Sequence, residues 1–320
     1  DFMQKVLEDK EYSLINPYSK KEQSKLRAKE VFDLIVEYAW KNGEPGIIFI
    51  DKMNEFNPTP HLGKYESTNP CGEQILLPFE SCNLGSINLS KVVSEVSGRK
   101  EVDWGKLKDI VHHSVHFLDN VIDMNRFPLK EIEEMTKTNR KIGLGVMGLA
   151  DMLIQLGVPY NSDEAIVLAE EVMSFINEEA KKKSVELSES RGSFPSFKDS
   201  VFTAKGVEKI RNATLTTIAP TGTISIISNT SSGIEPLFAL SYYRNVMDND
   251  KLIEINPIFE SIAKEEGFYS RKLMERIAEE GSVSDIEEVP EKYRKIFVTS
   301  HDIAPIWHTR MQAAFQKHTD

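Results

Sequence analysis

The chain has 320 residues, of which 40% are hydrophobic, 28% charged and 9% aromatic, a balance typical of a globular protein with a sizeable core. Its 39 lysines and arginines against 50 aspartates and glutamates give a formal net charge of −11. This charge argues against nucleic acid or an anionic membrane as the main partner, because both require a basic surface. A small anionic substrate is not excluded, since it needs only a local pocket of donors.

Neither a membrane span nor a signal peptide is expected. Apolar runs such as 46–50 reach about five residues, against the roughly 18 to 20 needed to cross a bilayer. The opening residues 1–5 lack the apolar core of a signal peptide. The sequence therefore predicts a cytoplasmic protein.

The predicted elements alternate between strands and long helices. In chain order they are a helix at 24–40, a short buried strand at 47–50, a helix at 103–124, a helix capped at 161–163 and ended at 191–192, a strand at 214–218 and a strand at 295–300. This alternation indicates an α/β fold. Neither a repeat nor a low-complexity linker marks a boundary, so residues 1–320 are predicted to form one domain.

The two cysteines are Cys71 and Cys82. They are too few for a disulfide-stapled secreted domain, and they cannot complete a four-ligand zinc site by themselves. His112 and His116 have i, i+4 spacing, but His113 stands where a zinc-binding helix carries glutamate, so no metal site is predicted.

The first candidate site is the loop at 69–73. Cys71 lies two residues from both Asn69 and Glu73, so Glu73 could act as a general base and Asn69 could hydrogen-bond a substrate group beside the sulfur. On residue types alone, a turn with a buried, inert cysteine is favoured, because thiol reactivity depends on the surroundings. Cys82 is typical of a strand cysteine beside a turn, and a Cys71–Cys82 disulfide stays open because the sequence does not give the geometry.

The second candidate site is a hydroxyl-rich loop that follows the predicted strand at 214–218. Its amides and hydroxyls suit a phosphate cradle at a helix N-terminus. It lacks the lysine of a nucleotide-binding P-loop, and a turn without a ligand fits equally well. The residues of this loop are Pro220, Thr221, Gly222, Thr223, Ile224 and Ser225.

The glycines at 143–148 match the G-x-G-x-x-G fingerprint of dinucleotide-binding proteins. A polar run at 137–141 precedes them, however, where the fingerprint requires a buried strand. Close packing of backbones is therefore the favoured interpretation, and an NAD-dependent oxidoreductase is the less favoured one.

Segments 69–73 and 80–89, taken together, resemble the large catalytic subunit of ribonucleotide reductase, most closely its adenosylcobalamin-dependent (class II) branch. Segments 140–151, 219–225, 231–236 and 311–318 extend the resemblance over essentially the whole chain. It implies a ten-stranded α/β barrel, of which residues 1–320 would form the finger loop and later strands of the catalytic domain. The paired tyrosines Tyr242 and Tyr243 are interpreted as core or pocket lining, because they follow the substrate loop.

The resemblance also implies a role for each candidate residue. Cys71 would carry the thiyl radical that abstracts the ribose 3′ hydrogen, Glu73 would take the 3′-hydroxyl proton, and Asn69 would hydrogen-bond the ribose. Cys82 would be one of two thiols that supply electrons as the 2′-hydroxyl leaves as water. The loop at 220–225 would hold the substrate phosphates.

Further expectations follow from the same family. The cofactor would be adenosylcobalamin, with the iron-dependent radical subunit of class I as the alternative. The partners would be a ribonucleoside di- or triphosphate, a thioredoxin-like or other dithiol reductant, and a second copy in a full-length homodimer. The family's other reducing cysteine and its C-terminal shuttle cysteines have no counterpart here, so the chain is expected to be an internal segment without turnover of its own. The alternative function is a non-catalytic nucleotide- or phosphate-binding fragment with structural cysteines.

Overall fold

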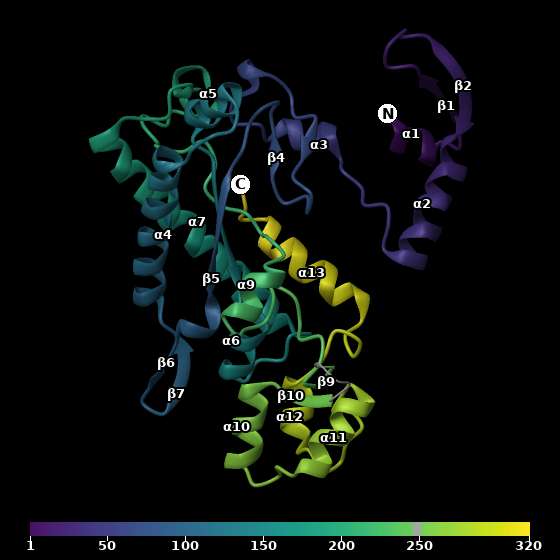
Figure 1. Ribbon diagram of the computed structural model, residues 1–320, viewed down its shortest axis with the longest axis vertical. Helices are drawn as coiled ribbons and strands as arrows, with labels where there is room; N and C mark the ends of the chain where they lie inside the picture. The colour runs from purple at the N-terminus through teal and green to yellow at the C-terminus, as the bar shows by residue number, and fades with distance from the viewer. Residues whose placement is uncertain (246–250) are drawn as a thin grey trace. The chain divides into compact units, whose positions relative to one another are not determined.

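A computed structural model describes residues 1–245 and 251–320 of the chain (Figure 1). The chain divides into two compact units, Asp1–Lys52 and Met53–Asp320, and each is described by itself. No helix within the described ranges is both long enough and apolar enough to cross a membrane.

The first unit contains one antiparallel strand pair. Strands β1 (Glu11–Ile15) and β2 (Glu22–Arg27) pair between helices α1 (Phe2–Leu7) and α2 (Ala28–Asn42), and α3 (Ile50–Glu55) begins at the end of the unit. The predicted helix at 24–40 therefore starts four residues later than expected, because residues 24–27 pair with β1.

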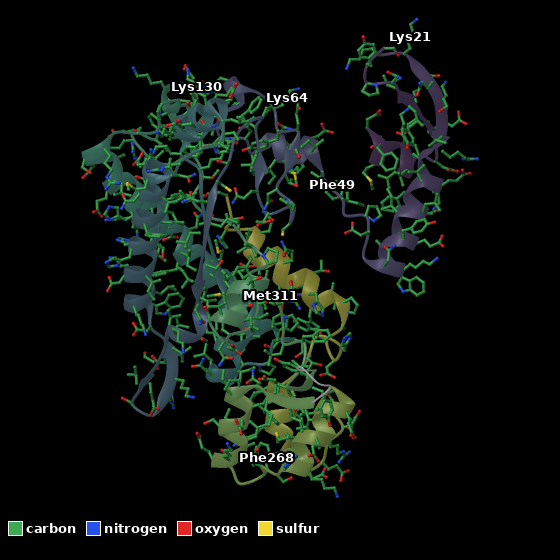
Figure 2. The ribbon with its side chains drawn as sticks, in the orientation of Figure 1. Lys21, Phe49, Lys64, Lys130, Phe268 and Met311 are labelled. Carbon is green, nitrogen blue, oxygen red and sulfur yellow. The ribbon has the colours of Figure 1, made fainter. Side chains whose placement is uncertain are left out.

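The predicted buried strand at 47–50 is wrong. Residues 47–49 have no regular structure, Phe49 is 55% exposed (Figure 2), and Ile50 begins α3. A short apolar run forms a strand only where another strand pairs with it, and none of the strand pairs in the described ranges includes this run.

The second unit mixes strands and helices around two apolar cores. Met311 belongs to the larger core, and Phe268 packs against the smaller one (Figure 2). The elements are β3 (Ser67–Thr68), β4 (Ile75–Leu76), β5 (Asn83–Asn88), β6 (Val93–Val96), β7 (Arg99–Val102), α4 (Trp104–Met124), α5 (Lys130–Asn139), β8 (Ile142–Met147), α6 (Leu149–Leu156), α7 (Asp163–Arg191), α8 (Val201–Ala204), α9 (Gly222–Ile227), β9 (Ser241–Asn245), β10 (Lys251–Ile255), α10 (Pro257–Glu265), α11 (Arg271–Glu280), α12 (Glu291–Ile296), α13 (Pro305–Gln316) and the 3₁₀ turns Pro60–Leu62, Leu89–Lys91 and Phe197–Asp199.

Two long helices confirm their predicted positions, and the second confirms its predicted cap. The Asp103 carboxylate accepts a hydrogen bond from the amide of Lys106 at the start of α4, and Ser162 Oγ accepts one from the amide of Ala165 at the start of α7. Helix α7 ends before Gly192, as the sequence predicts. The two helices pack against each other (Figure 1), and their facing sides supply much of the larger core.

The α/β class is confirmed by a parallel strand pair. Strand β5 pairs with β8 in register from Asn83 opposite Ile142 to Asn88 opposite Met147, and α4 and α5 form the crossover between them. Every residue of β8 is buried.

The predicted strand at 214–218 runs parallel to β8, as expected for a third strand. The Leu144 amide donates to the carbonyl of Leu215 at 2.8 Å, the Thr217 amide donates to the carbonyl of Leu144 at 3.1 Å, and Leu144 and Thr216 form a parallel bridge. Apart from these hydrogen bonds and this one bridge to β8, residues 214–218 do not form a regular strand.

The predicted strand at 295–300 is wrong for its first half. Lys295 and Ile296 complete α12, and Phe297 is buried against Phe259 in the smaller core. Thr299 alone makes a parallel bridge, to Leu237. The apolar side chains of this run pack against helices of the smaller core, so the run begins as the end of a helix and not as a strand.

The glycines of the 143–148 motif allow three chain segments to meet, which confirms the packing interpretation. A Cβ at Gly143 would lie 2.5 Å from both Gln74 Nε2 and Leu84 Cδ2, and 2.9 Å from Thr217 Cγ2. A Cβ at Gly145 would overlap the carbonyl oxygen of Thr217. Only residues without a side chain allow segment 214–218 to approach β8 this closely.

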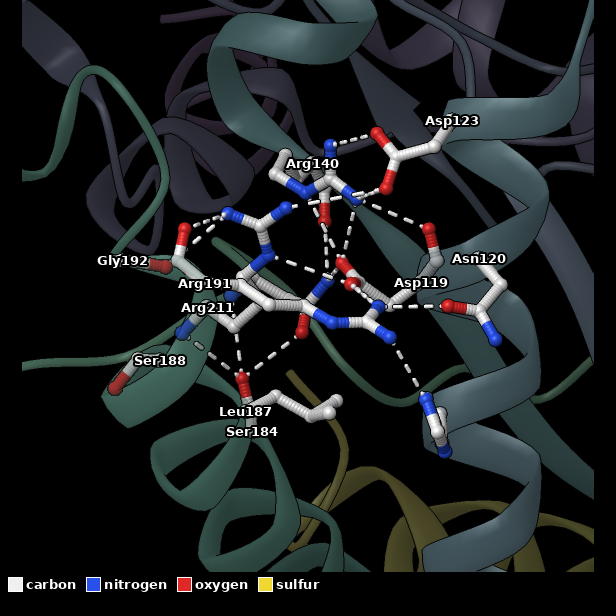
Figure 3. A network of polar contacts seen from close by, with 12 residues as sticks. Asp119, Asn120, Asp123, Arg140, Ser184, Leu187, Ser188, Arg191, Gly192 and Arg211 are labelled. Carbon is white, nitrogen blue, oxygen red and sulfur yellow. Dashed lines mark hydrogen bonds and ion pairs between the residues drawn. The ribbon is translucent and has the colours of Figure 1, made fainter.

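A buried carboxylate ties the ends of three other segments together (Figure 3). Asp119 on α4 is fully buried, and its Oδ1 accepts from Arg140 at 2.9 Å and from Asn212 at 3.0 Å. Its Oδ2 accepts from Arg191 at 3.1 Å and from Arg211 at 3.3 Å. These partners precede β8, end α7 and precede segment 214–218, so Asp119 fixes where those elements begin or end.

We predict that Gly145→Ala destabilises the chain by about 1–3 kcal/mol or more, because the added methyl must displace backbone. Gly105→Ala is the matched control, since its Cβ would meet only Asp103 Oδ1, at an ordinary 3.6 Å, near the start of α4. That variant should be neutral or slightly stabilising. Urea unfolding of both variants measures the difference, and equal stability of the two would contradict the packing role.

We predict that Asp119→Asn lowers the free energy of unfolding by about 3–5 kcal/mol, because three arginines lose a buried counter-charge. The control is Asp163→Asn, whose exposed ion pair with Arg310 should contribute at most about 1 kcal/mol. Chemical denaturation monitored by circular dichroism compares the two. A loss at Asp119 no larger than that at Asp163 would show that the network is dispensable.

Candidate active site

Cys71 lies at the tip of a short hairpin. Strands β3 and β4 pair antiparallel, and the loop between them is closed by hydrogen bonds between the Asn69 amide and the Gln74 carbonyl at 3.2 Å and between the Gly72 amide and the Asn69 carbonyl at 3.0 Å. Gly72 has φ +84°, a conformation that suits glycine. Cys71 is an exposed free thiol, so the alternative of a buried, inert cysteine is wrong.

Asn69 shapes this loop. Its side-chain oxygen accepts a hydrogen bond from the Gln74 amide at 3.0 Å. The oxygen is therefore committed to the turn, and the side-chain NH₂ is the group that Asn69 can direct to a ligand.

Glu73 combines a buried carboxylate oxygen with an anchored backbone. Within the described ranges its Oε2 is buried without a hydrogen-bond partner. Its carbonyl accepts a hydrogen bond from Thr217 Oγ1 at 2.8 Å. A buried oxygen that lacks a donor is suited to receive a proton or a hydroxyl group from a ligand.

Cys82 is the second thiol, half-buried and directly before β5. It is free, so the structure contains no Cys71–Cys82 disulfide. Burial raises the pKa of Cys82 to about 12, against the lowering effect of the Lys141 charge, and Glu80 and Glu73 raise it further. The thiol is therefore protonated at neutral pH.

An ion pair that the sequence did not predict lies close to Cys82 in the chain. Lys141 Nζ lies 2.6 Å from Glu80 Oε2, and the two side chains are 1% and 0% exposed. The signals were present, since Glu80 lies two residues before Cys82 and Lys141 ends the polar run at 137–141. The sequence gives no sign that either charge is buried.

The loop at 220–225 opens helix α9. Thr221 has φ +59° and precedes the helix, Gly222 and Thr223 are exposed, and Thr221 and Ser225 are buried. The first amides of a helix have no acceptor within it, so the exposed turn at 222–224 presents donors suited to an anion.

Two of the predicted phosphate-binding hydroxyls have structural partners. Thr221 Oγ1 accepts from the amide of Gly233 at 2.7 Å. Ser225 Oγ donates to the carbonyl of Gly222 at 3.0 Å and lies 2.8 Å from Ser232 Oγ. These hydroxyls join the loop to segment 231–233. The exposed part of the loop is Pro220, Gly222, Thr223 and Ile224, and Pro220 has no amide hydrogen to donate.

Thr217 connects the two candidate sites. Its hydroxyl binds the Glu73 carbonyl, and Pro220 follows three residues later, at most about 11 Å away along an extended backbone. The cysteine hairpin is therefore tied to the segment that leads into the loop at 220–225 (the anion loop).

A cavity of about 400 Å³ lies beyond the end of β8, and its lining includes Tyr242 and Asp151. The pocket-lining interpretation is thus confirmed for Tyr242. Asp151 Oδ2 accepts from Thr230 Oγ1 at 2.7 Å and from the amide of Ser231 at 2.8 Å. Asp151 thereby fixes the chain that leaves α9.

The histidines at 112–116 have protein partners. His112 Nε2 lies 2.8 Å from Glu179 Oε2, and His116 Nε2 lies 2.9 Å from Arg191 Nη2. No cluster of three or more His, Cys, Asp or Glu side chains suited to a metal occurs in the ranges that the structure describes.

The second unit thus combines a parallel β/α/β unit, a hairpin with an exposed cysteine at its tip and a loop that opens a short helix. The chain belongs to the ribonucleotide reductase family: the model of the "Ribonucleotide reductase, barrel domain" matches residues 1–209 and 203–320.

Two curated proteins are similar to the chain over its whole length. The chain is 51% identical over 320 residues to the vitamin B12-dependent ribonucleoside-diphosphate reductase of Thermoplasma acidophilum, and covers 41% of that protein. It is 46% identical over 319 residues to the Mycobacterium tuberculosis H37Rv protein of the same name, and covers 44% of it. The chain therefore spans less than half the length of these curated relatives.

A solved structure supports the fold. The alpha subunit of a class Id ribonucleotide reductase from Actinobacillus ureae matches the whole chain and 56% of its own with a TM-score of 0.77. At 22% identity, this match supports the ribonucleotide reductase fold alone.

Proposed function

We propose that this chain carries the radical chemistry of a ribonucleotide reductase, which reduces ribonucleotides to 2′-deoxyribonucleotides for DNA synthesis. The observation that carries the proposal is the exposed Cys71 thiol in one loop with the partnerless Glu73 oxygen, tied through Thr217 to the anion loop. A nucleotide with its phosphates on the amides at 222–224 would bring its ribose toward that thiol.

The proposed reaction assigns each group one task. A thiyl radical on Cys71 takes the hydrogen from C3′, and Glu73 takes the proton of the 3′-hydroxyl while the NH₂ of Asn69 binds the ribose. The 2′-hydroxyl leaves as water. Cys82 and a second thiol supply two electrons and two protons and end as a disulfide, after which Cys71 returns its hydrogen to C3′.

The proposed cofactor is adenosylcobalamin, which supplies a carbon-centred radical that can oxidise a thiol. The names of the relatives favour it over the iron-dependent radical subunit of class I, which is the alternative. The exposed Cys71 sulfur fits such an exchange, because a hydrogen atom must pass directly between the two radical sites.

The same relatives supply the finer expectations. Their names favour a ribonucleoside diphosphate over the triphosphate. Five further expectations stay predictions. They are the ten-stranded barrel, its extent over residues 1–320, a dithiol reductant of the thioredoxin type, a homodimer and a cytoplasmic location.

We predict that Cys71→Ser abolishes reduction, with at least about a thousandfold loss, because an O–H bond is too strong to carry the radical reversibly. The test replaces the matching segment of the Thermoplasma acidophilum reductase with this chain and measures deoxynucleotide formation with adenosylcobalamin and a dithiol. Ser67→Ala, on the same hairpin, is the control and should retain activity.

Nucleotide binding separates this proposal from its alternative. The Cys71→Ser chimera should bind a ribonucleoside diphosphate as tightly as the parent chimera, since the phosphates bind at 222–224. A binding fragment with structural cysteines predicts no reductase activity in either protein, and that result would refute the proposal.

A further inference from the structure

The buried pair of Glu80 and Lys141 is held on both sides by other polar groups. Glu80 Oε1 accepts from Asn139 Nδ2 at 2.7 Å, and Oε2 accepts from the amide of Leu77 at 2.9 Å. Lys141 Nζ donates to the hydroxyl of Tyr65 at 3.1 Å and lies 4.7 Å from the centre of its ring. The pair is therefore fixed in one geometry rather than mobile at a surface.

This pair lies beside Cys82. Glu80 is two residues before Cys82 in the chain. Cys82 and Lys141 directly precede Asn83 and Ile142, which are opposite each other in the parallel pair of β5 and β8. Cys82 and Lys141 therefore stand at neighbouring positions where the two parallel strands begin.

The charges that act on Cys82 come from three segments. Lys141 precedes β8 and lowers the pKa of the thiol, whereas Glu80 and Glu73, from the chain before β5 and from the hairpin loop, raise it. Tyr65 contacts Lys141, and burial raises the pKa of that tyrosine, so it is a neutral neighbour. Lys141 is the positive charge among these groups.

Burying two opposite charges costs free energy, because both lose their hydration. A protein in which an apolar pair of similar size replaces them is often at least as stable. Thiol–disulfide exchange, in contrast, is favoured by a nearby positive charge, because the charge stabilises the thiolate. When a dithiol reduces a disulfide that contains Cys82, the S–S bond breaks, the attacking thiolate forms a new S–S bond, and Cys82 leaves with the electron pair as a thiolate. A half-buried thiolate in apolar surroundings is unfavourable without a cation.

We propose that Lys141 is a positioning residue that stabilises the thiolate of Cys82, and that Glu80 holds Lys141 in place and limits its effect. The role of this thiolate in turnover rests on the proposed function. The effect of Lys141 on the sulfur does not, and it is measurable without catalysis.

The test uses the two-cysteine composition of the chain. In the Cys71→Ser variant, Cys82 is the remaining thiol, and its rate of alkylation by iodoacetamide is measured as a function of pH. Lys141→Met should lower this rate about tenfold at a given pH, which corresponds to a rise of one unit in the pKa of Cys82.

Three further variants separate an electrostatic role from a structural one. Lys141→Arg keeps the charge and should restore most of the rate. Lys137→Met removes a lysine that pairs with Glu133 on the surface and should change nothing. The double variant Glu80→Gln/Lys141→Met leaves no lone buried charge. Its rate should lie below that of the parent, because Lys141 acts on the thiol more strongly than Glu80 does, even if Lys141→Met fails to fold.

An alkylation profile that stays within twofold of the parent in both Lys141→Met and the double variant, with circular dichroism unchanged, would overturn the inference. Failure of the chimera to reduce ribonucleotides would refute the proposed function and leave these rates unaffected. The two outcomes are therefore distinguishable.

Discussion

The close approach of three segments at one face of β8 is the constraint on which the candidate site depends. Gly143 and Gly145 leave room for Gln74 of the hairpin, Leu84 of β5 and Thr217 of the third parallel segment. This contact brings Thr217 to the carbonyl of Glu73 and directs the chain toward the anion loop. A motif typical of a dinucleotide site thus serves to pack backbones, and the chemistry lies around it.

Two clusters of buried charged side chains lie around the parallel pair of β5 and β8. Asp119 gathers three arginines where the flanking elements begin or end, and Glu80 with Lys141 occupies the entrance of the two parallel strands. Both clusters are hydrogen-bonded on several atoms, as buried charges must be. The first cluster is explained by stability alone, whereas the second lies beside a thiol whose ionisation it influences.

The sequence predicts features that are local in the chain better than it predicts which segments pack or pair with each other. The extents of α4 and α7, the cap of α7, the α/β class and the packing glycines follow from residue patterns that are local in the sequence. The runs at 47–50 and 295–300 fail because a few apolar residues do not reveal whether a strand or a helix packs beside them. Residue types singled out Cys71, Glu73 and the anion loop as candidates, and the family resemblance gave them their expected roles. Lys141 and Thr217 act through contacts across more than 60 residues of chain, which no local pattern shows.

The central claim is that the Cys71 sulfur and the amides at 222–224 act on a single nucleotide. A crystal structure of the chimeric reductase with a ribonucleoside diphosphate tests this most directly. The account predicts the phosphates on those amides and C3′ of the ribose in van der Waals contact with Cys71 Sγ. Phosphates bound elsewhere, or a ribose separated from the sulfur by other side chains, would contradict it.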